Sequence, residues 1–252
     1  ICVANDTMPI EDYLEARCFN LTVEIFYNAS VCSELIKFLK FYQISASSFI
    51  HQIHLHLNQN KTDFSSIYEG FLSDNKEIWK TEQEIKDFLK KPGTRQRYQD
   101  GELGNNEQLK YRALSLLEKM GSIHDVSFKI AKQMTANEKI LNDQVEEYLN
   151  ELSDFSLARK INLLAIDSVV RKEFHYDFIA LMSKNFEGDP TEYYQSEKHT
   201  FEIKHTESQK ETIREYVKIF GTSYYGFGSI LSQSQARNFF REVELLDIPQ
   251  PA

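Results

Sequence analysis

The stretch NEKILNDQVEEYLNEL (Asn137–Leu152) decides the fold class, because its apolar residues recur at helical spacing. Intervals of three and four residues place them on one side of a helix, which can then pack against a neighbour. Proline, which breaks helix interiors, is absent from residues 94–189 around it. We therefore expect a mainly α-helical protein in which this helix joins the core through Ile140, Leu141, Val145, Tyr148, Leu149 and Leu152.

The same spacing predicts helices before this stretch. A first helix begins at Pro9, which suits the first turn of a helix, and runs to about Tyr27. The segment Ser45–Ser48 supplies the cap of a later helix, and Lys91-Pro92-Gly93 is a strong helix stop. Besides these, helices are expected over 31–42, 63–72, 75–90, 105–120 and 122–134.

Apart from residues 1–8, strand patterns are confined to the last third of the chain. Apolar and polar residues alternate near residues 197–205, which predicts a short β element. The apolar run 174–182 begins as a strand and turns helical near Asp177. A helix follows from Thr206 to Gly221, and a glycine-bearing loop at 224–228 precedes a last helix over 229–243. The expected fold is a multi-helix, bundle-like array with this minor β element.

The expected organisation has three parts. Residues 1–8 form a residual strand or linker from a preceding barrel, residues 9–245 form the helical domain, and residues 246–252 form a tail. The break at 91–94 marks a possible subdivision, and a single cooperative helical unit is the alternative. Because the chain starts at Ile1 and not at Met, we interpret it as processed, truncated or a fragment.

The amino-acid composition limits the classes of partner that the chain is expected to bind. With 29 Lys and Arg against 38 Asp and Glu, the net charge of −9 disfavours binding to nucleic acid or to an anionic membrane. No apolar run approaches the roughly 18 residues of a membrane-spanning helix. Three widely spaced cysteines fit a reducing compartment, so we expect a cytoplasmic protein. The many aromatic residues either pack the core or form an exposed docking face, and the second interpretation predicts homo-oligomers.

Histidine pairs are the most tempting metal ligands. His51 and His54 are three residues apart on one helical face, whereas His56 points elsewhere, and two ligands do not complete a zinc site. His199 and His205 are about 20 Å apart on a strand and cannot share an ion. A metal-dependent enzyme that uses His51 and His54 with carboxylates is the weakest of three hypotheses.

Motifs for nucleophilic catalysis or phosphate binding are not found in the sequence. It contains no G-x-S-x-G elbow, no G-x-x-x-x-G-K-[ST] loop and no G-x-G-x-x-G loop. Cys18 and Cys32 fall on or near apolar helix faces, where cysteine acts as a small hydrophobic residue. We therefore expect no catalytic, cofactor-binding or metal-binding residue in this chain.

Two stretches near the start, MPIEDYLEAR (Met8–Arg17) and LTVEIFYN (Leu21–Asn28), resemble a segment of radical S-adenosylmethionine proteins. The similarity is to the region directly after the catalytic barrel in cobalamin-binding-type members. Later stretches resemble the carboxy-terminal extension of the same group: Asp100–Asn106 with Lys110–Arg112, Phe174–Asp177, Tyr224–Leu231 and Phe239–Val243.

This resemblance implies a non-catalytic helical domain of a larger radical S-adenosylmethionine enzyme. Its partner would be the preceding barrel of the same polypeptide, which it would shield or supply with substrate contacts. The parent protein would use a 4Fe–4S cluster and S-adenosylmethionine, with cobalamin as an option. The C-x-x-x-C-x-x-C and D-x-H-x-x-G signatures are absent, and Ser122-Ile-His124-Asp125 does not match the second, so no family site residue transfers. The alternative is a freestanding helical protein–protein interaction module whose acidic surface binds a basic partner.

Overall fold

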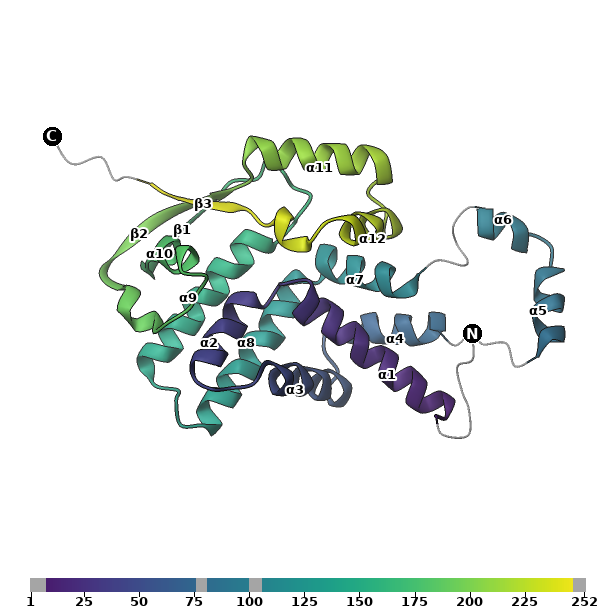
Figure 1. Ribbon diagram of the computed structural model, residues 1–252, viewed down its shortest axis with the longest axis horizontal. Coiled ribbons are helices and arrows are strands. Elements are labelled where there is room, and N and C mark those ends of the chain that lie inside the picture. Colours follow the sequence, from purple (N-terminus) through teal and green to yellow (C-terminus); the bar gives the residue numbers. More distant parts are fainter. Residues whose placement is uncertain (1–7, 76–80, 100–105, 247–252) are drawn as a thin grey trace.

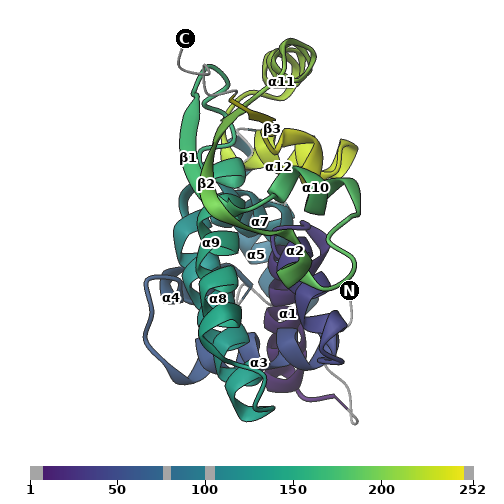
Figure 2. The same ribbon diagram turned by 90° about the vertical axis from the view of Figure 1, so that its left-hand side faces the viewer.

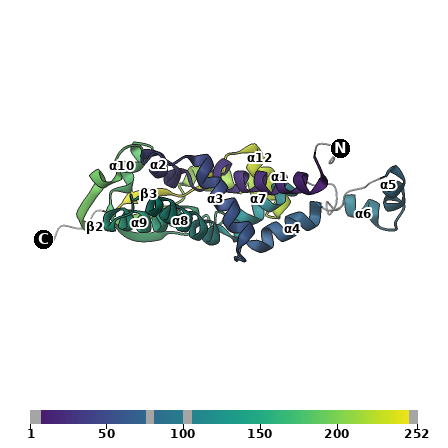
Figure 3. The ribbon, with the colours of Figure 1, turned by 90° about the horizontal axis from the view of Figure 1, so that it is seen from below.

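The computed structural model describes residues 8–75, 81–99 and 106–246. Figure 3 shows an elongated molecule, with a small sheet at one end and the helices α5 and α6 at the other. Helices make up most of the described part and the sheet has three antiparallel strands, so the expected mainly α fold with a minor β element is confirmed.

The amino-terminal third is helical, as predicted. Helix α1 continues without a break into a π-helical segment, η1, which ends at Asn28. The Ser45 hydroxyl accepts a hydrogen bond from the Ser48 amide and caps α3, as the sequence indicates. The bounds are α1 Ile10–Val23, η1 Glu24–Asn28, α2 Ser33–Phe41, α3 Ala46–Gln59 and α4 Ser65–Asn75.

Three consecutive helices form the middle of the molecule (Figure 1): α7 Glu107–Glu118, α8 Met120–Asn137 and α9 Asp143–Lys160. The predicted stripe is confirmed within α9, where Val145, Tyr148, Leu149 and Leu152 are all buried. Ile140 and Leu141 instead precede the helix and are half-buried, because Asn142 caps its start. Helix α9 extends beyond Leu152, where the predicted stretch ends, and its additional turns carry Arg159 and Lys160 into the interior.

The sheet has the strand order β1-β2-β3 and comprises β1 Val170–Tyr176, β2 Tyr194–Lys204 and β3 Glu242–Leu245. Its β2 strand contains the predicted element and is longer. The expected change from strand to helix is confirmed, since Asp177 caps α10 (Phe178–Ser183) directly after β1. The pairing of β1 with β2 shifts register between Phe174 and Tyr176, which places His175 at a bulge.

The carboxy-terminal region contains two corrections. Helix α11 (Glu207–Phe220) ends at Gly221 as expected, but the predicted loop over 224–228 is helical and begins α12 (Tyr224–Gln233). Ser223 caps this helix, and a side chain at Gly228 would lie 2.9 Å from the carbonyl oxygen of Leu109 in α7. These glycines therefore permit close helix packing. The predicted helix over 229–243 is wrong, because a 3-10 turn (Ala236–Phe239) and β3 follow α12.

Helices α5 (Glu82–Leu89) and α6 (Thr94–Gln99) form a pair away from the other helices (Figure 1). The expected stop lies between them, where Gly93 has a φ of 82° and the Thr94 hydroxyl donates to the Phe88 carbonyl oxygen. A domain boundary at 91–94 stays a prediction. Residues 1–7 of the expected linker and residues 247–252 of the expected tail lie outside the described residues.

Within residues 8–75, 81–99 and 106–246, no helix is both long enough and apolar enough to cross a lipid bilayer.

Candidate functional site: a polar cavity beside a buried charge network

A cavity of about 600 Å³ lies where five parts of the chain meet. Ser33, Glu34 and Lys37 line it from the start of α2, and Arg159 lines it from the end of α9. The remaining walls come from the end of α10, the first turns of α11, and the segment 237–242. Hydroxyl, amide and guanidinium groups therefore face a space large enough for a small molecule.

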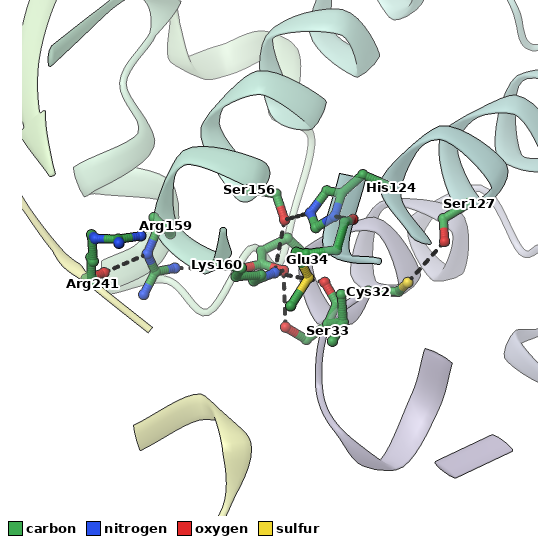
Figure 4. A network of polar contacts seen from close by, with 11 residues as sticks. Cys32, Ser33, Glu34, His124, Ser127, Ser156, Arg159, Lys160 and Arg241 are labelled. Atoms are coloured by element: carbon green, nitrogen blue, oxygen red, sulfur yellow. Dashed lines mark hydrogen bonds and ion pairs between the residues drawn. The ribbon is translucent and has the colours of Figure 1, made fainter. Parts of the chain in front are cut away.

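Behind this cavity lies a buried charge network, which comprises Glu34, Arg159, Lys160 and Arg241 (Figure 4). The Lys160 side chain has no exposed surface, and its Nζ donates to Glu34 Oε2 at 2.6 Å. The same ammonium donates to the Val31 carbonyl oxygen and to Ser156 Oγ, so each of its three protons has an acceptor. Burial lowers the pKa of Lys160, and the neighbouring Glu34 carboxylate opposes that shift. The three acceptors hold the ammonium in one position.

The network continues from Lys160 into a chain of hydrogen bonds with one direction. Because Lys160 can only donate, Ser156 accepts from it and donates its own proton to His124 Nε2 at 3.0 Å. His124 Nδ1 then donates to the Met120 carbonyl oxygen. Burial, followed by the charge of Lys160, lowers the pKa of His124 to about 4. The imidazole is thus neutral and its tautomer is set by its neighbours.

Arg241 ties β3 to the end of α9. Its guanidinium donates to the carbonyl oxygens of Ala158, Ile161 and Asn162, which the end of the helix leaves without intrahelical partners. Two more hydrogen bonds join Arg159 and Arg241: the Arg241 amide donates to Arg159 O, and the side-chain Nε of Arg159 donates to Arg241 O. Two cations near the negative end of a helix are favourably placed.

The charges in this region do not balance. Three cations of the buried charge network share one carboxylate, that of Glu34. Burial alone would raise the pKa of Glu34, but the neighbouring charges of Lys160 and Arg159 hold it below its usual value, so this carboxylate stays ionised. The network therefore keeps a net positive charge beside the cavity.

Arg159 brings part of this charge to the cavity wall. It is only 9% exposed, and its Nη1 is 3.4 Å from Glu34 Oε1, while Nη2 makes no hydrogen bond with the described residues. Arg237 also lines the cavity; it is exposed and forms no ion pair within that part of the chain. Two guanidinium groups that line one cavity suit an anionic group such as a carboxylate or phosphate.

The structure explains the predicted histidines without a metal ion. His54 is buried between Thr22 Oγ1, at 2.8 Å from its Nδ1, and Asn58, whose Nδ2 is 3.0 Å from its Nε2. Both ring nitrogens are therefore engaged, whereas His51 is exposed. His205 is buried against the Phe239 carbonyl oxygen.

The cysteines within the described residues do not fit an iron–sulfur ligand set. Burial raises the pKa of both Cys18 and Cys32 to about 11, whereas a cluster is held by thiolates. Cys32 lies 3.1 Å from the Ser127 hydroxyl on α8, and Cys18 belongs to the apolar face of α1. Cys2 lies outside the described residues. Both thiols behave as the small hydrophobic residues that the sequence predicts.

The residues that form this site are not among those that the sequence predicts as functional. Glu34, Arg159 and Arg241 are separated by more than two hundred positions, and neither spacing nor charge pattern connects them. The sequence contains one signal for this site. The apolar stripe of α9 continues through Phe155 toward Lys160, which predicts a lysine at the end of a buried helix face. Comparison with known proteins adds nothing to this geometry, since no protein-family model, no curated protein and no solved structure matches the chain.

Proposed function

We propose that this chain is a helical domain of a larger radical S-adenosylmethionine enzyme, and that it contributes to substrate binding through the polar cavity. The chemistry of the cluster and of S-adenosylmethionine belongs to the rest of the enzyme. The role of this domain is to hold part of the substrate and to cover the neighbouring barrel, which keeps water from reactive intermediates.

The observation that carries the proposal is that stretches with the family resemblance contact one another. Arg112, from one stretch, forms an ion pair with Glu24, from another, at 2.9 Å between Nη1 and Oε2. Tyr225, from a third, lies beneath the Lys110 ammonium, whose Nζ is 5.8 Å from the centre of its ring. Stretches scattered along a sequence are expected to meet in space if they belong to one inherited core, and these contacts support that interpretation.

The cavity defines the class of substrate. Arg159 Nη2 and the Arg237 guanidinium provide donors for an anion, and the Ser208 hydroxyl on α11 adds a neutral donor. A small molecule with a carboxylate or phosphate group matches this lining best. Two carboxylates also line the cavity. Glu34 is already paired with Lys160, and Glu242 on β3 is exposed to solvent, which screens its charge more strongly than that of the buried Arg159.

The first experiment uses the complete product of the gene, with any coding sequence upstream of Ile1. After purification without oxygen, we expect about four irons and four sulfides per polypeptide, as one 4Fe–4S cluster requires. Cobalt in addition would identify a cobalamin-binding member. A product that stays free of iron after reconstitution with iron and sulfide would contradict the proposal.

A second experiment tests the cavity in the chain itself, with inorganic phosphate as the probe. Phosphate should raise the melting temperature of the protein, and Arg237→Ala should abolish that increase, because the variant removes one of the two guanidinium groups. Arg214→Ala on α11 is the matched control, since Arg214 is also exposed but does not line the cavity. An equal phosphate effect in both variants would exclude the cavity as the anion site.

An interaction module remains the second candidate, and helix α11 favours it. This helix has fourteen residues, but Ile213 alone is fully buried, and Ile219 is 71% exposed. Such an apolar residue on an outer helix suits contact with another protein. An iron-free gene product combined with a phosphate-insensitive melting temperature would make this candidate the better one.

A further inference from the structure

Glu147, Glu151 and His175 form a second cluster, away from the lining of the polar cavity. The two carboxylates lie one turn apart on α9, and the histidine lies at the bulge of β1, which packs beside α9 (Figure 2). One ligand atom of each residue lies within 4.8 Å of the others, and all three residues are half-buried. The Glu147–Glu151–His175 cluster thus combines carboxylate oxygen and imidazole nitrogen, two of the common ligands of transition-metal ions.

The contacts of His175 leave one of its ring nitrogens available to bind a metal ion. Its Nδ1 is 3.0 Å from the Gln195 carbonyl oxygen, which can only accept, so Nδ1 carries the proton. The neutral ring therefore keeps a lone pair on Nε2. A hydrogen bond from the other ring nitrogen to a backbone carbonyl is the usual support of a metal-ligating histidine. Stacking of the ring on Tyr194 fixes its plane.

The carboxylates lack a cationic partner. Among the described residues, no Lys or Arg forms an ion pair with Glu147 or Glu151. Glu151 accepts from the backbone amides of His175 and Tyr176, which neutralises only part of its charge, and Glu147 makes no hydrogen bond there. Burial and, next, the negative charges of Glu147 and Glu151 raise the pKa of the neighbouring Tyr176. The two half-buried carboxylates therefore lie close together, and no cation among the described residues pairs with them.

We propose that Glu147, Glu151 and His175 bind one divalent transition-metal ion, with Zn²⁺ as the best match. Three protein ligands and a water complete the tetrahedral coordination that Zn²⁺ prefers. The imidazole disfavours Mg²⁺ and Ca²⁺, which select oxygen ligands. The ion would join the bulge of β1 to α9. This proposal does not depend on the proposed anion cavity or on the proposed radical enzyme.

The test is calorimetric titration of the metal-free chain with Zn²⁺. We expect one tight site per chain, an affinity at least tenfold lower in Glu147→Gln, and an unchanged affinity in Glu146→Gln. Glu146 is the matched control, because it is the adjacent residue on the same helix and lies 3.7 Å from Lys132. Saturating Zn²⁺, at about a hundred times the dissociation constant, should raise the melting temperature by about 5–10 °C.

Three outcomes would overturn the proposal. The first is the absence of a stoichiometric site, and the second is an affinity that neither Glu147→Gln nor His175→Ala changes. The third is equal competition by Mg²⁺, which would show that the imidazole takes no part. Since Glu147 has no described partner, its variant should melt at the temperature of the metal-free wild type or up to about 2 °C above it. A normal melt followed by weaker binding therefore separates loss of a ligand from loss of the fold.

Discussion

The buried charge network and the Glu147–Glu151–His175 cluster both include residues of α9, but their charges are paired with opposite charges to different extents. In the network, every proton of Lys160 has an acceptor and the Glu34 carboxylate has two cationic partners. In the cluster, two carboxylates share a half-buried place and no cation pairs with them among the described residues. Lys160 and Glu34 find all their partners within the chain, whereas the second arrangement leaves coordinating atoms for an ion. Charge pairing thus distinguishes a structural polar group from a binding site.

The largest expected effect comes from breaking the complete arrangement. Lys160→Met leaves the Glu34 carboxylate buried beside Arg159 alone, which should lower the free energy of unfolding by about 3–5 kcal/mol. Urea unfolding measures this loss. Lys37→Met is the control, since its exposed ion pair with Glu187 should contribute about 0–1 kcal/mol. A loss under about 1 kcal/mol in Lys160→Met would show that the network is not a unit.

The pH dependence of stability tests the neutral His124 at the end of the same network. Its folded pKa is about 4, against 6.5 in the unfolded chain. Below pH 6.5 the unfolded chain therefore binds a proton that the folded chain refuses, and the free energy of unfolding falls until about pH 4, by about 3 kcal/mol in total. Denaturant unfolding between pH 8 and pH 4 measures the slope. His124→Gln should flatten it, and an identical slope in the variant would contradict the assignment.

The smallest effect is expected in the incomplete arrangement, and it has the opposite sign. Without metal, Glu147→Gln removes one of two like charges a helical turn apart and should stabilise the protein by about 0.2–0.5 kcal/mol. Chelator-treated protein in urea unfolding provides the measurement. Glu146→Gln should instead be neutral or slightly destabilising, because it loses the neighbouring Lys132 charge. A destabilisation above about 1 kcal/mol in Glu147→Gln would place this carboxylate among the structural groups.

The elements that the sequence predicted correctly are those with local causes. Asp177 ends a strand and caps a helix, and Thr206 and Gly221 bound α11, because caps and stops act within one or two turns. The 224–228 segment was predicted as a loop for the same local reason, its glycines. The helix has a local signal in Ser223, whose hydroxyl caps it, whereas the close approach of Gly228 to Leu109, more than a hundred residues away, has no local pattern.

The two sites show the same limit. Glu147 and Glu151 are four residues apart, so a helix prediction already places them on one face. His175 joins them through a β-bulge that has no sequence signal. The polar cavity takes residues from 30 to 242 and depends on the packing of α2, α9 and α11. Sequence patterns thus indicate single elements, and the chemistry arises where these elements meet.

The small sheet has a further consequence for how copies of this protein behave at high concentration. Among the described residues, β1 and β3 each pair only with β2, so each has a free side that a strand of a second molecule could join. Consecutive charged residues, Arg171 to Glu173, occupy β1, and Glu242 and Glu244 occupy β3. Addition of a second β3 would bring like charges together. The sheet thereby resists edge-to-edge aggregation, and its charged strands protect the protein's solubility as well as its shape.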